Sequence, residues 1–269
     1  MLLSYVIFSL VSICAKKYYF HDDITWRQGI LDIFAFKALT YAWYINLWIG
    51  LYVLIPFINI GWKAIPTRRM KEWLLLILFL LTALPDFGNR YGFSLFPYYW
   101  ETTAYPLCFY LCGAYIREYR PSFDKRKLLL VTLGLLWFQP VANLFIPHPT
   151  YVHFVGDENG IIRLPATIGF FLLIYDMDVK SLRWRTVLQH IALCSLDIYL
   201  ISPVFDRAYY AGFRERFFEN QSQFGPYIPL VIMCVFLSSY AMASLKRVLF
   251  RGLERRIESR RGALAFKLT

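Results

Sequence analysis

The sequence predicts an all-α protein that crosses a membrane repeatedly, a polytopic bundle of about eight transmembrane helices. Of the 269 residues, 58% are apolar and only 17% are charged, whereas soluble domains average about 45–50% apolar and 25% charged residues. The apolar residues also come in blocks, which short charged or Pro/Asn/Gly-containing stretches separate. These two observations argue against a soluble enzyme, a disordered chain and a disulfide scaffold.

The apolar blocks predict helices rather than the strands of an outer-membrane barrel. A barrel strand alternates in polarity over about ten residues, and blocks such as 73–81 (WLLLILFLL) do not alternate. A spanning helix satisfies its own backbone groups in lipid. At about 1.5 Å per residue, roughly 20 residues cross the hydrocarbon layer.

Taken in order, the blocks give eight expected spans, of which the first and third are short. They cover residues 1–15, 42–60, 72–86, 99–116, 128–146, 161–177, 187–204 and 227–245. We therefore expect a transmembrane domain of residues 1–245 and a basic cytoplasmic tail of residues 246–269. The tail repeats apolar residues every four positions, at Leu249, Leu253 and Ile257. This pattern fits either a helix lying on anionic lipid or a solvated basic end.

The basic residues predict the orientation of the chain, because Lys and Arg beside a span stay in the cytoplasm. Of the 29 basic residues, 20 lie in alternate connections and the tail, at 61–71, 117–127, 178–186 and 246–269. The C-terminus and, with eight spans, Met1 are therefore expected in the cytoplasm. The net charge of +11 is a topology signal in this interpretation, since no motif for nucleic-acid binding accompanies it.

Polar residues at membrane depth are costly and mark candidate functional sites. In the fourth expected span, Glu101 shares one helix face with two cysteines, within about 40°. In the seventh, His190, Cys194 and Asp197 lie within about 60° of one another by the same count. His190 and Asp197 could be a general base and its orienter, or each could pair with a residue on another helix. Polar residues of this kind also commonly hold helices together without a catalytic role.

Two connections expected on the outer face combine aromatic residues with Arg, His or carboxylates. They are residues 147–160 (PHPTYVHFVGDENG) and residues 205–226. Sugars and lipid headgroups are bound by such residues through stacking and bidentate hydrogen bonds. Interfacial aromatic belts have the same composition.

Three segments carry a resemblance to a known family. They are 41–59 (YAWYINLWIGLYVLIPFIN), 105–119 (YPLCFYLCGAYIREY) and 194–203 (CSLDIYLISP). They resemble, in order, spacing and orientation, the IGLYLL-x-P, FLLGAYIR and SFGIYLIHP segments of the acyltransferase-3 family. The resemblance extends over most of residues 1–250.

The resemblance implies a bacterial inner-membrane protein with about ten core helices in the complete family fold. Such proteins transfer an acyl group, usually acetyl, from cytoplasmic acyl-CoA to a hydroxyl of an exported or cell-surface polysaccharide. The implied partners are thus acyl-CoA, a glycan acceptor and the lipid bilayer. We expect no metal and no tightly bound cofactor, because no set of three or four suitable ligands recurs at a metal-binding spacing.

The sequence departs from the family at positions that matter for catalysis. The family's first helix carries an Arg and an essential His about eleven residues later, and an Arg motif follows its second helix. Neither is present, so the chain is expected to begin within the family's third span, which accounts for eight spans rather than ten. Ser202 stands where the family often has His.

The remaining candidates for chemistry are few. His190, Asp197 and Glu101 are the candidate catalytic residues, since acyl transfer to an alcohol needs a base and stabilisation of an oxyanion. Four cytoplasmic arginines could bind the phosphates of CoA, or could simply be positive-inside flanks. They are Arg68, Arg69, Arg117 and Arg120.

Two other classes of function use the same helices. One is a transporter or flippase-like component of glycan export, which inverted repeats would favour; none is evident in the sequence. The other is a non-catalytic scaffold in a glycan-assembly complex. An acyltransferase that lacks the family's first helices is the leading interpretation.

Overall fold

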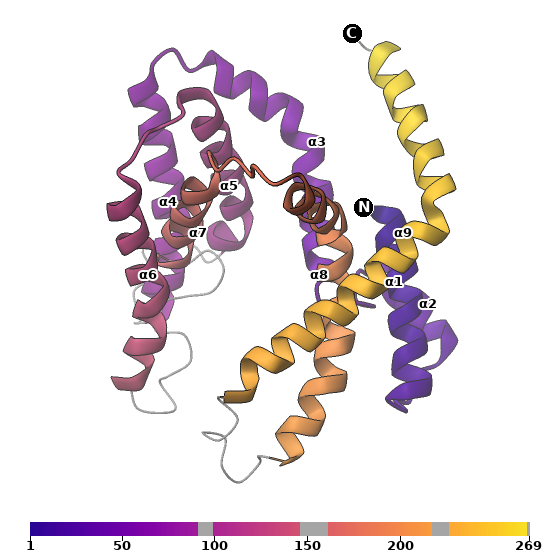
Figure 1. The fold of residues 1–269 in the computed structure, drawn as a ribbon. Coiled ribbons are helices and arrows are strands. Elements are labelled where there is room, and N and C mark those ends of the chain that lie inside the picture. The colour runs from indigo at the N-terminus through magenta and orange to yellow at the C-terminus, as the bar shows by residue number, and fades with distance from the viewer. Residues whose placement is uncertain (91–98, 146–160, 217–225, 268–269) are drawn as a thin grey trace. The chain divides into compact units, whose positions relative to one another are not determined.

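A computed structural model describes residues 1–90, 99–145, 161–216 and 226–267 (Figure 1). Within these ranges the protein is all-helical, which confirms the predicted class. The elements are α1 (Leu2–Cys14), a π-helical turn η1 (Ala15–Tyr19), α2 (Trp26–Phe34), α3 (Ala42–Ala64), α4 (Arg68–Arg90), α5 (Tyr99–Tyr119), α6 (Lys125–Phe145), α7 (Arg163–Ile174), α8 (Leu182–Arg216) and α9 (Ile228–Lys267).

Each of the eight expected spans overlaps a helix, but the number of membrane crossings is not confirmed. Among the described residues, four helical stretches are long and apolar enough to cross a bilayer: Leu2–Tyr19, Ala42–Ala64, Leu182–Phe213 and Ile228–Gly252. Helix α7 is apolar but has only 12 residues. These stretches support a membrane protein, and eight spans stay a prediction.

Two helices are longer than their expected spans. Helix α8 continues to Arg216, so the first half of the expected outer loop 205–226 is helical. Helix α9 continues from Ile228 to Lys267, without a break at residue 245 where the tail was expected to begin. Both extensions contain several Arg and Ala residues, which are good helix formers.

The chain divides into two compact units, and the expected division into residues 1–245 and a tail stays a prediction. Unit 1 comprises residues 1–49 and 179–269, and unit 2 comprises residues 50–178. In unit 1, α1 packs against α8, and α8 packs against α9. The buried core joins Tyr5 and Phe8 of α1 to Leu200 and Ile201 of α8.

Unit 2 is built from two pairs of helices, α4 with α5 and α6 with α7. Its largest buried cluster takes Trp62 from α3, Leu78 from α4, Cys108 from α5 and Leu164 from α7. The pairing of α4 with α5 is the feature that positions the polar residues described below.

Helix α7 approaches α6 closely at Gly169, because a Cβ there would collide with the hydroxyl oxygen of Thr132. Gly169→Ala is expected to destabilise the protein by about 1–3 kcal/mol, as overpacking of a filled interior does. The measurement is thermal unfolding in detergent. Gly134→Ala is the matched control, because nothing lies within 4 Å of a Cβ at Gly134 and alanine is the better helix former by about 0.5–1 kcal/mol. Equal melting temperatures for the two variants would contradict the close approach.

Candidate functional site

The predicted base His190 lies on α8 of unit 1 and contacts α9. Its Nδ1 is 2.7 Å from the hydroxyl oxygen of Tyr240, whose ring meets the imidazole edge-on at 5.6 Å between centroids. Cys194, one turn further along α8, is fully buried, with its sulfur 4.0 Å from the same nitrogen. The imidazole itself is half-buried. Tyr240 therefore fixes one ring nitrogen of His190, and only the other is left for chemistry.

Asp197 lies two turns after His190 on α8 and has a different partner. Its carboxylate accepts a hydrogen bond from the ammonium of Lys246 at 3.1 Å, and the same ammonium donates to the hydroxyl of Ser4 at 3.0 Å. The side chains of Asp197 and Lys246 are only 7% and 5% exposed. This ion pair joins α1, α8 and α9 inside unit 1.

His190 and Asp197 do not contact each other. Each instead pairs with a residue on another helix, Tyr240 and Lys246 respectively. Seven residues of helix separate His190 from Asp197 by about 10 Å along the axis, which is too far for a direct hydrogen bond. The backbone of Glu101, the third candidate, lies in α5, and its side chain lies outside the described residues, as do residues 147–160 of the expected outer loop. The catalytic roles of His190, Asp197 and Glu101 stay predictions.

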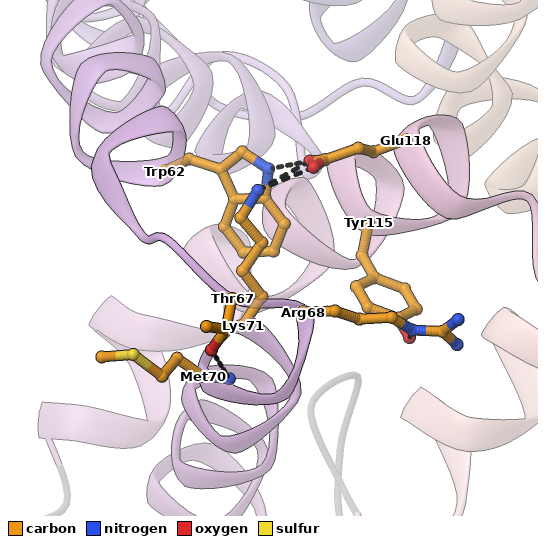
Figure 2. A network of polar contacts seen from close by, with 7 residues as sticks. All are labelled: Trp62, Thr67, Arg68, Met70, Lys71, Tyr115 and Glu118. Atoms are coloured by element: carbon orange, nitrogen blue, oxygen red, sulfur yellow. Dashed lines mark hydrogen bonds and ion pairs between the residues drawn. The ribbon is translucent and has the colours of Figure 1, made fainter.

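A second polar site lies in unit 2, where the start of α4 meets the end of α5 (Figure 2). We call Trp62, Arg68, Lys71, Glu72, Tyr115 and Glu118 the α4–α5 polar cluster. Its centre is the ammonium of Lys71, which donates to both carboxylate oxygens of Glu118, at 2.7 and 3.0 Å. The indole N–H of Trp62 donates to the same carboxylate at 2.8 Å.

Lys71 is buried in spite of its charge, with 6% of its side chain exposed. Its ammonium lies 4.9 Å from the centre of the Trp62 ring and 5.6 Å from that of Tyr119. An ion pair, two aromatic faces and hydrogen bonds replace the water that the ammonium has lost. The cluster thereby ties the end of α3 and the start of α4 to the end of α5.

Arg68 forms the outer edge of the cluster. Its Nε donates to Glu72 at 2.9 Å and to the Tyr115 hydroxyl at 3.0 Å, and the Tyr115 hydroxyl donates to Glu72 at 2.5 Å. The guanidinium stacks over Tyr115 and Tyr119, at 5.7 and 5.1 Å. In Figure 2 its terminal nitrogens point away from the cluster. The contacts thus orient Arg68 through Nε and leave its terminal fork directed outward.

The other three predicted arginines lie at the same end of the α4–α5 pair. Arg69 follows Arg68 in the first turn of α4, Arg117 lies in the last turn of α5, and all three side chains are exposed. Arg120 follows α5 with φ of 42°, and its N–H donates to the carbonyl of Ile116 at 2.9 Å. Such a left-handed residue ends a helix. The structure therefore places the four arginines at one end of the α4–α5 pair, and their ligand stays a prediction.

The ion pair of the cluster predicts a specific pH dependence. The Lys71 ammonium and then the Trp62 N–H hold the pKa of Glu118 below its usual 4.5, and Glu118 raises the pKa of Lys71 above 10.5. Stability from Glu118 is present above pH 4.5 and is lost as the pH falls through its lowered pKa. Stability from Lys71 is present below pH 10.5 and is lost as the pH rises through its raised pKa.

Glu118→Gln is therefore expected to melt below the parent protein between about pH 5 and 10 and to converge with it in stronger acid. The measurement is the melting temperature in detergent at a series of pH values. Glu72→Gln, which removes an exposed carboxylate without touching Lys71, is the comparison. A gap between parent and Glu118→Gln that persists unchanged into strong acid would rule out the ion pair as its source.

Comparison with known proteins decides the family. The acyltransferase-3 family model, described as an acyltransferase domain, matches residues 1–244. The chain belongs to the acyltransferase-3 family. No curated protein and no solved structure matches the chain. The family match covers all helices of both units up to the middle of α9, which confirms the resemblance inferred from the three segments.

Within the acyltransferase-3 family, this chain differs at the site just described. In the resemblance of residues 194–203 to the SFGIYLIHP-type segment, Asp197 stands at the glycine position and Ser202 at the histidine position. The Ser202 hydroxyl donates to the carbonyl of Tyr199 at 3.0 Å. The carboxylate of Asp197 forms an ion pair with Lys246, which neutralises its charge in the interior of unit 1. The substitution of glycine by aspartate thus coincides with a buried ion pair.

Sequence reasoning missed Tyr240, Lys246 and most of the α4–α5 polar cluster. The charge pattern assigns Lys246 to the basic tail, whereas its side chain is buried in unit 1. A usable signal was the intramembrane carboxylate itself, because a charge at that depth requires a partner. For Lys71 and Glu118, the signal lies in their positions beside consecutive expected spans. Lys71 directly precedes the span 72–86 and Glu118 follows the span 99–116, so two opposite charges are expected at the same ends of two neighbouring helices.

Proposed function

We propose that this chain is a bacterial inner-membrane O-acyltransferase, which transfers an acyl group, foremost acetyl, from cytoplasmic acyl-CoA to a hydroxyl of an exported or cell-surface polysaccharide. The family match over residues 1–244 carries the proposal, because it spans the helical body rather than one motif. The four candidate membrane-spanning stretches among the described residues are consistent with a membrane location.

The chemistry needs a base for the acceptor hydroxyl, and His190 is the candidate. With the Nδ1 proton donated to Tyr240, Nε2 keeps its lone pair and can accept the hydroxyl proton. The alkoxide oxygen then bonds to the thioester carbonyl carbon, the C–S bond breaks, and the proton passes to the CoA thiolate. Tyr240 is in this scheme a positioning residue, since it fixes the imidazole through Nδ1.

The donor would be held by its phosphates at the end of the α4–α5 pair, where the candidate arginines are Arg68, Arg69, Arg117 and Arg120. Arg68 supports this role best, because Glu72 and Tyr115 orient it through Nε while its terminal fork points outward. A guanidinium fork matches two phosphate oxygens. The positive-inside pattern predicts this end of the α4–α5 pair on the cytoplasmic side, where acyl-CoA is found.

Gene deletion followed by complementation tests the proposal. Ester-linked acyl groups on the surface polysaccharides are measured by NMR before and after mild base treatment, in the parent strain, the deletion strain and the complemented strain. We expect one O-acyl signal to disappear on deletion and to return with the complete reading frame. Unchanged acylation of every envelope glycan would exclude the enzyme, and accumulation of unexported glycan in its place would favour the transporter.

A further inference from the structure

Helix α2 folds back along α1 instead of lying in an external connection. Gly29 of α2 packs against Ile13 near the end of α1, where a Cβ would come within 2.9 Å of the isoleucine side chain. Further on, the Tyr5 hydroxyl donates to the carbonyl of Ile33 at 2.7 Å, and the Tyr5 ring stacks on Phe36 at 5.0 Å. Figure 1 shows the two helices side by side.

These contacts show how far residues 29–36 extend alongside α1. Ile13 and Tyr5 are eight residues apart on α1, which is about 12 Å along the helix. The stretch Leu2–Tyr19 is one of the segments long and apolar enough to cross a bilayer. The residues of α2 that make these contacts, Gly29 and Ile33, are four residues or about 6 Å apart along their own helix, so this segment lies beside about a fifth of a hydrocarbon layer about 30 Å thick.

In the non-helical segment between α2 and α3, backbone groups form hydrogen bonds within the protein. The chain reverses at Phe36 with φ of 55°, and the carbonyl of Ala38 accepts from the Ser12 hydroxyl at 3.3 Å and from the Lys16 ammonium at 3.1 Å. The carbonyl of Asp32 accepts the N–H groups of residues 37 and 38, at 2.8 and 3.1 Å. Non-helical backbone within a membrane is tolerated where the protein satisfies it in this way.

The outer face of α2 is mostly apolar and exposed, with Lys17 over the Trp26 ring, its ammonium 5.5 Å from the ring centre. Trp26, Ile30 and Phe34 recur every four residues and are 42%, 48% and 79% exposed. The polar Asp32 lies on the opposite side, about 160° from Ile30 at 100° per residue, and accepts a hydrogen bond from Gln28. Arg27 lies in the first turn, from which a long side chain can reach the membrane surface.

We propose that α2 is a re-entrant half-helix whose Trp26–Ile30–Phe34 face contacts the acyl chains of the lipid bilayer. The helix enters beside the end of α1, its C-terminal part contacts the Tyr5 side chain, and the chain turns back at Phe36 to the level of Ser12 before α3 begins.

Spin-label accessibility tests this assignment in vesicles of phosphatidylethanolamine and phosphatidylglycerol. Single cysteines replace Ile30, Phe34, Asp23 and Ile232 in a variant whose five native cysteines are changed to alanine. Asp23 is an exposed residue before α2, and Ile232 is a 60% exposed residue of a candidate span. We expect labels at 30 and 34 to collide frequently with oxygen and rarely with a water-soluble nickel complex, like the label at 232 and unlike that at 23.

Two results would overturn the proposal. Frequent nickel collisions at 30 and 34 would place the face in water, and rare collisions with both reagents would mean that another protein surface covers it. A benzophenone-bearing phenylalanine at position 34, in the chain with its native cysteines, gives an independent measurement if the cysteine-free variant does not fold. Photolysis is expected to yield a phospholipid adduct, and exclusive protein–protein cross-links or no adduct would argue against lipid contact.

Discussion

Lys246→Met is expected to destabilise the protein by about 3–5 kcal/mol, the cost of leaving one charge of a buried pair without its partner. The ammonium of Lys246 is 3.1 Å from Asp197 and 3.0 Å from the hydroxyl of Ser4. Its removal leaves a carboxylate that is 7% exposed among α1, α8 and α9. Unfolding in detergent and the steady-state amount of protein in membranes measure the effect.

The double variant Asp197→Asn/Lys246→Met separates this cause from a general loss of packing. With both charges removed, most of the lost stability is expected to return, because replacing a whole buried pair is often close to neutral. Lys63→Met makes the same chemical change at an exposed position and is expected to cost less than about 0.5 kcal/mol. Two results would contradict a stabilising role of the buried ion pair. One is equal melting temperatures for Lys246→Met and Lys63→Met, and the other is a double variant that is no more stable than Lys246→Met alone.

The helices were predictable where hydrophobic blocks identify them, and α2 was not. Its nine residues include Arg27, Gln28 and Asp32, so no apolar run marks it. What holds it in place is its contact with α1, through Gly29 against Ile13 and Ile33 against Tyr5. Contacts between segments that are 16 to 28 residues apart depend on how the chain turns between them, which local pattern does not specify.

The site was predictable along one helix and not between helices. The spacing of His190, Cys194 and Asp197 correctly placed them near one stripe of α8, and His190 and Cys194 do meet. Their partners Tyr240 and Lys246 lie about 50 residues away on α9. Which residues of α9 face α8 depends on the rotation of both helices, and this is fixed by packing rather than by spacing.

His190→Ala is expected to lower acyl transfer by about 10²–10⁴-fold, the usual contribution of a positioned general base. The assay follows acyl transfer from acetyl-CoA to the exported polysaccharide in inside-out vesicles. The loss is expected in kcat, with little change in KM for the donor, because His190 is not among the residues proposed to bind CoA. Gln189→Ala, at the exposed neighbouring position, is expected to retain parental activity.

Tyr240→Phe distinguishes a positioned base from a histidine that only holds α8 against α9. The variant keeps the ring that packs edge-on against the imidazole and removes the hydroxyl 2.7 Å from Nδ1. It is expected to reduce kcat less than His190→Ala does, to shift the pH dependence of the reaction and to melt near the parent protein, because one hydrogen bond contributes about 1 kcal/mol. A purely structural histidine predicts the reverse, a lower melting temperature with an unaltered pH profile, and a His190→Ala protein that is folded and fully active would remove His190 from the mechanism altogether.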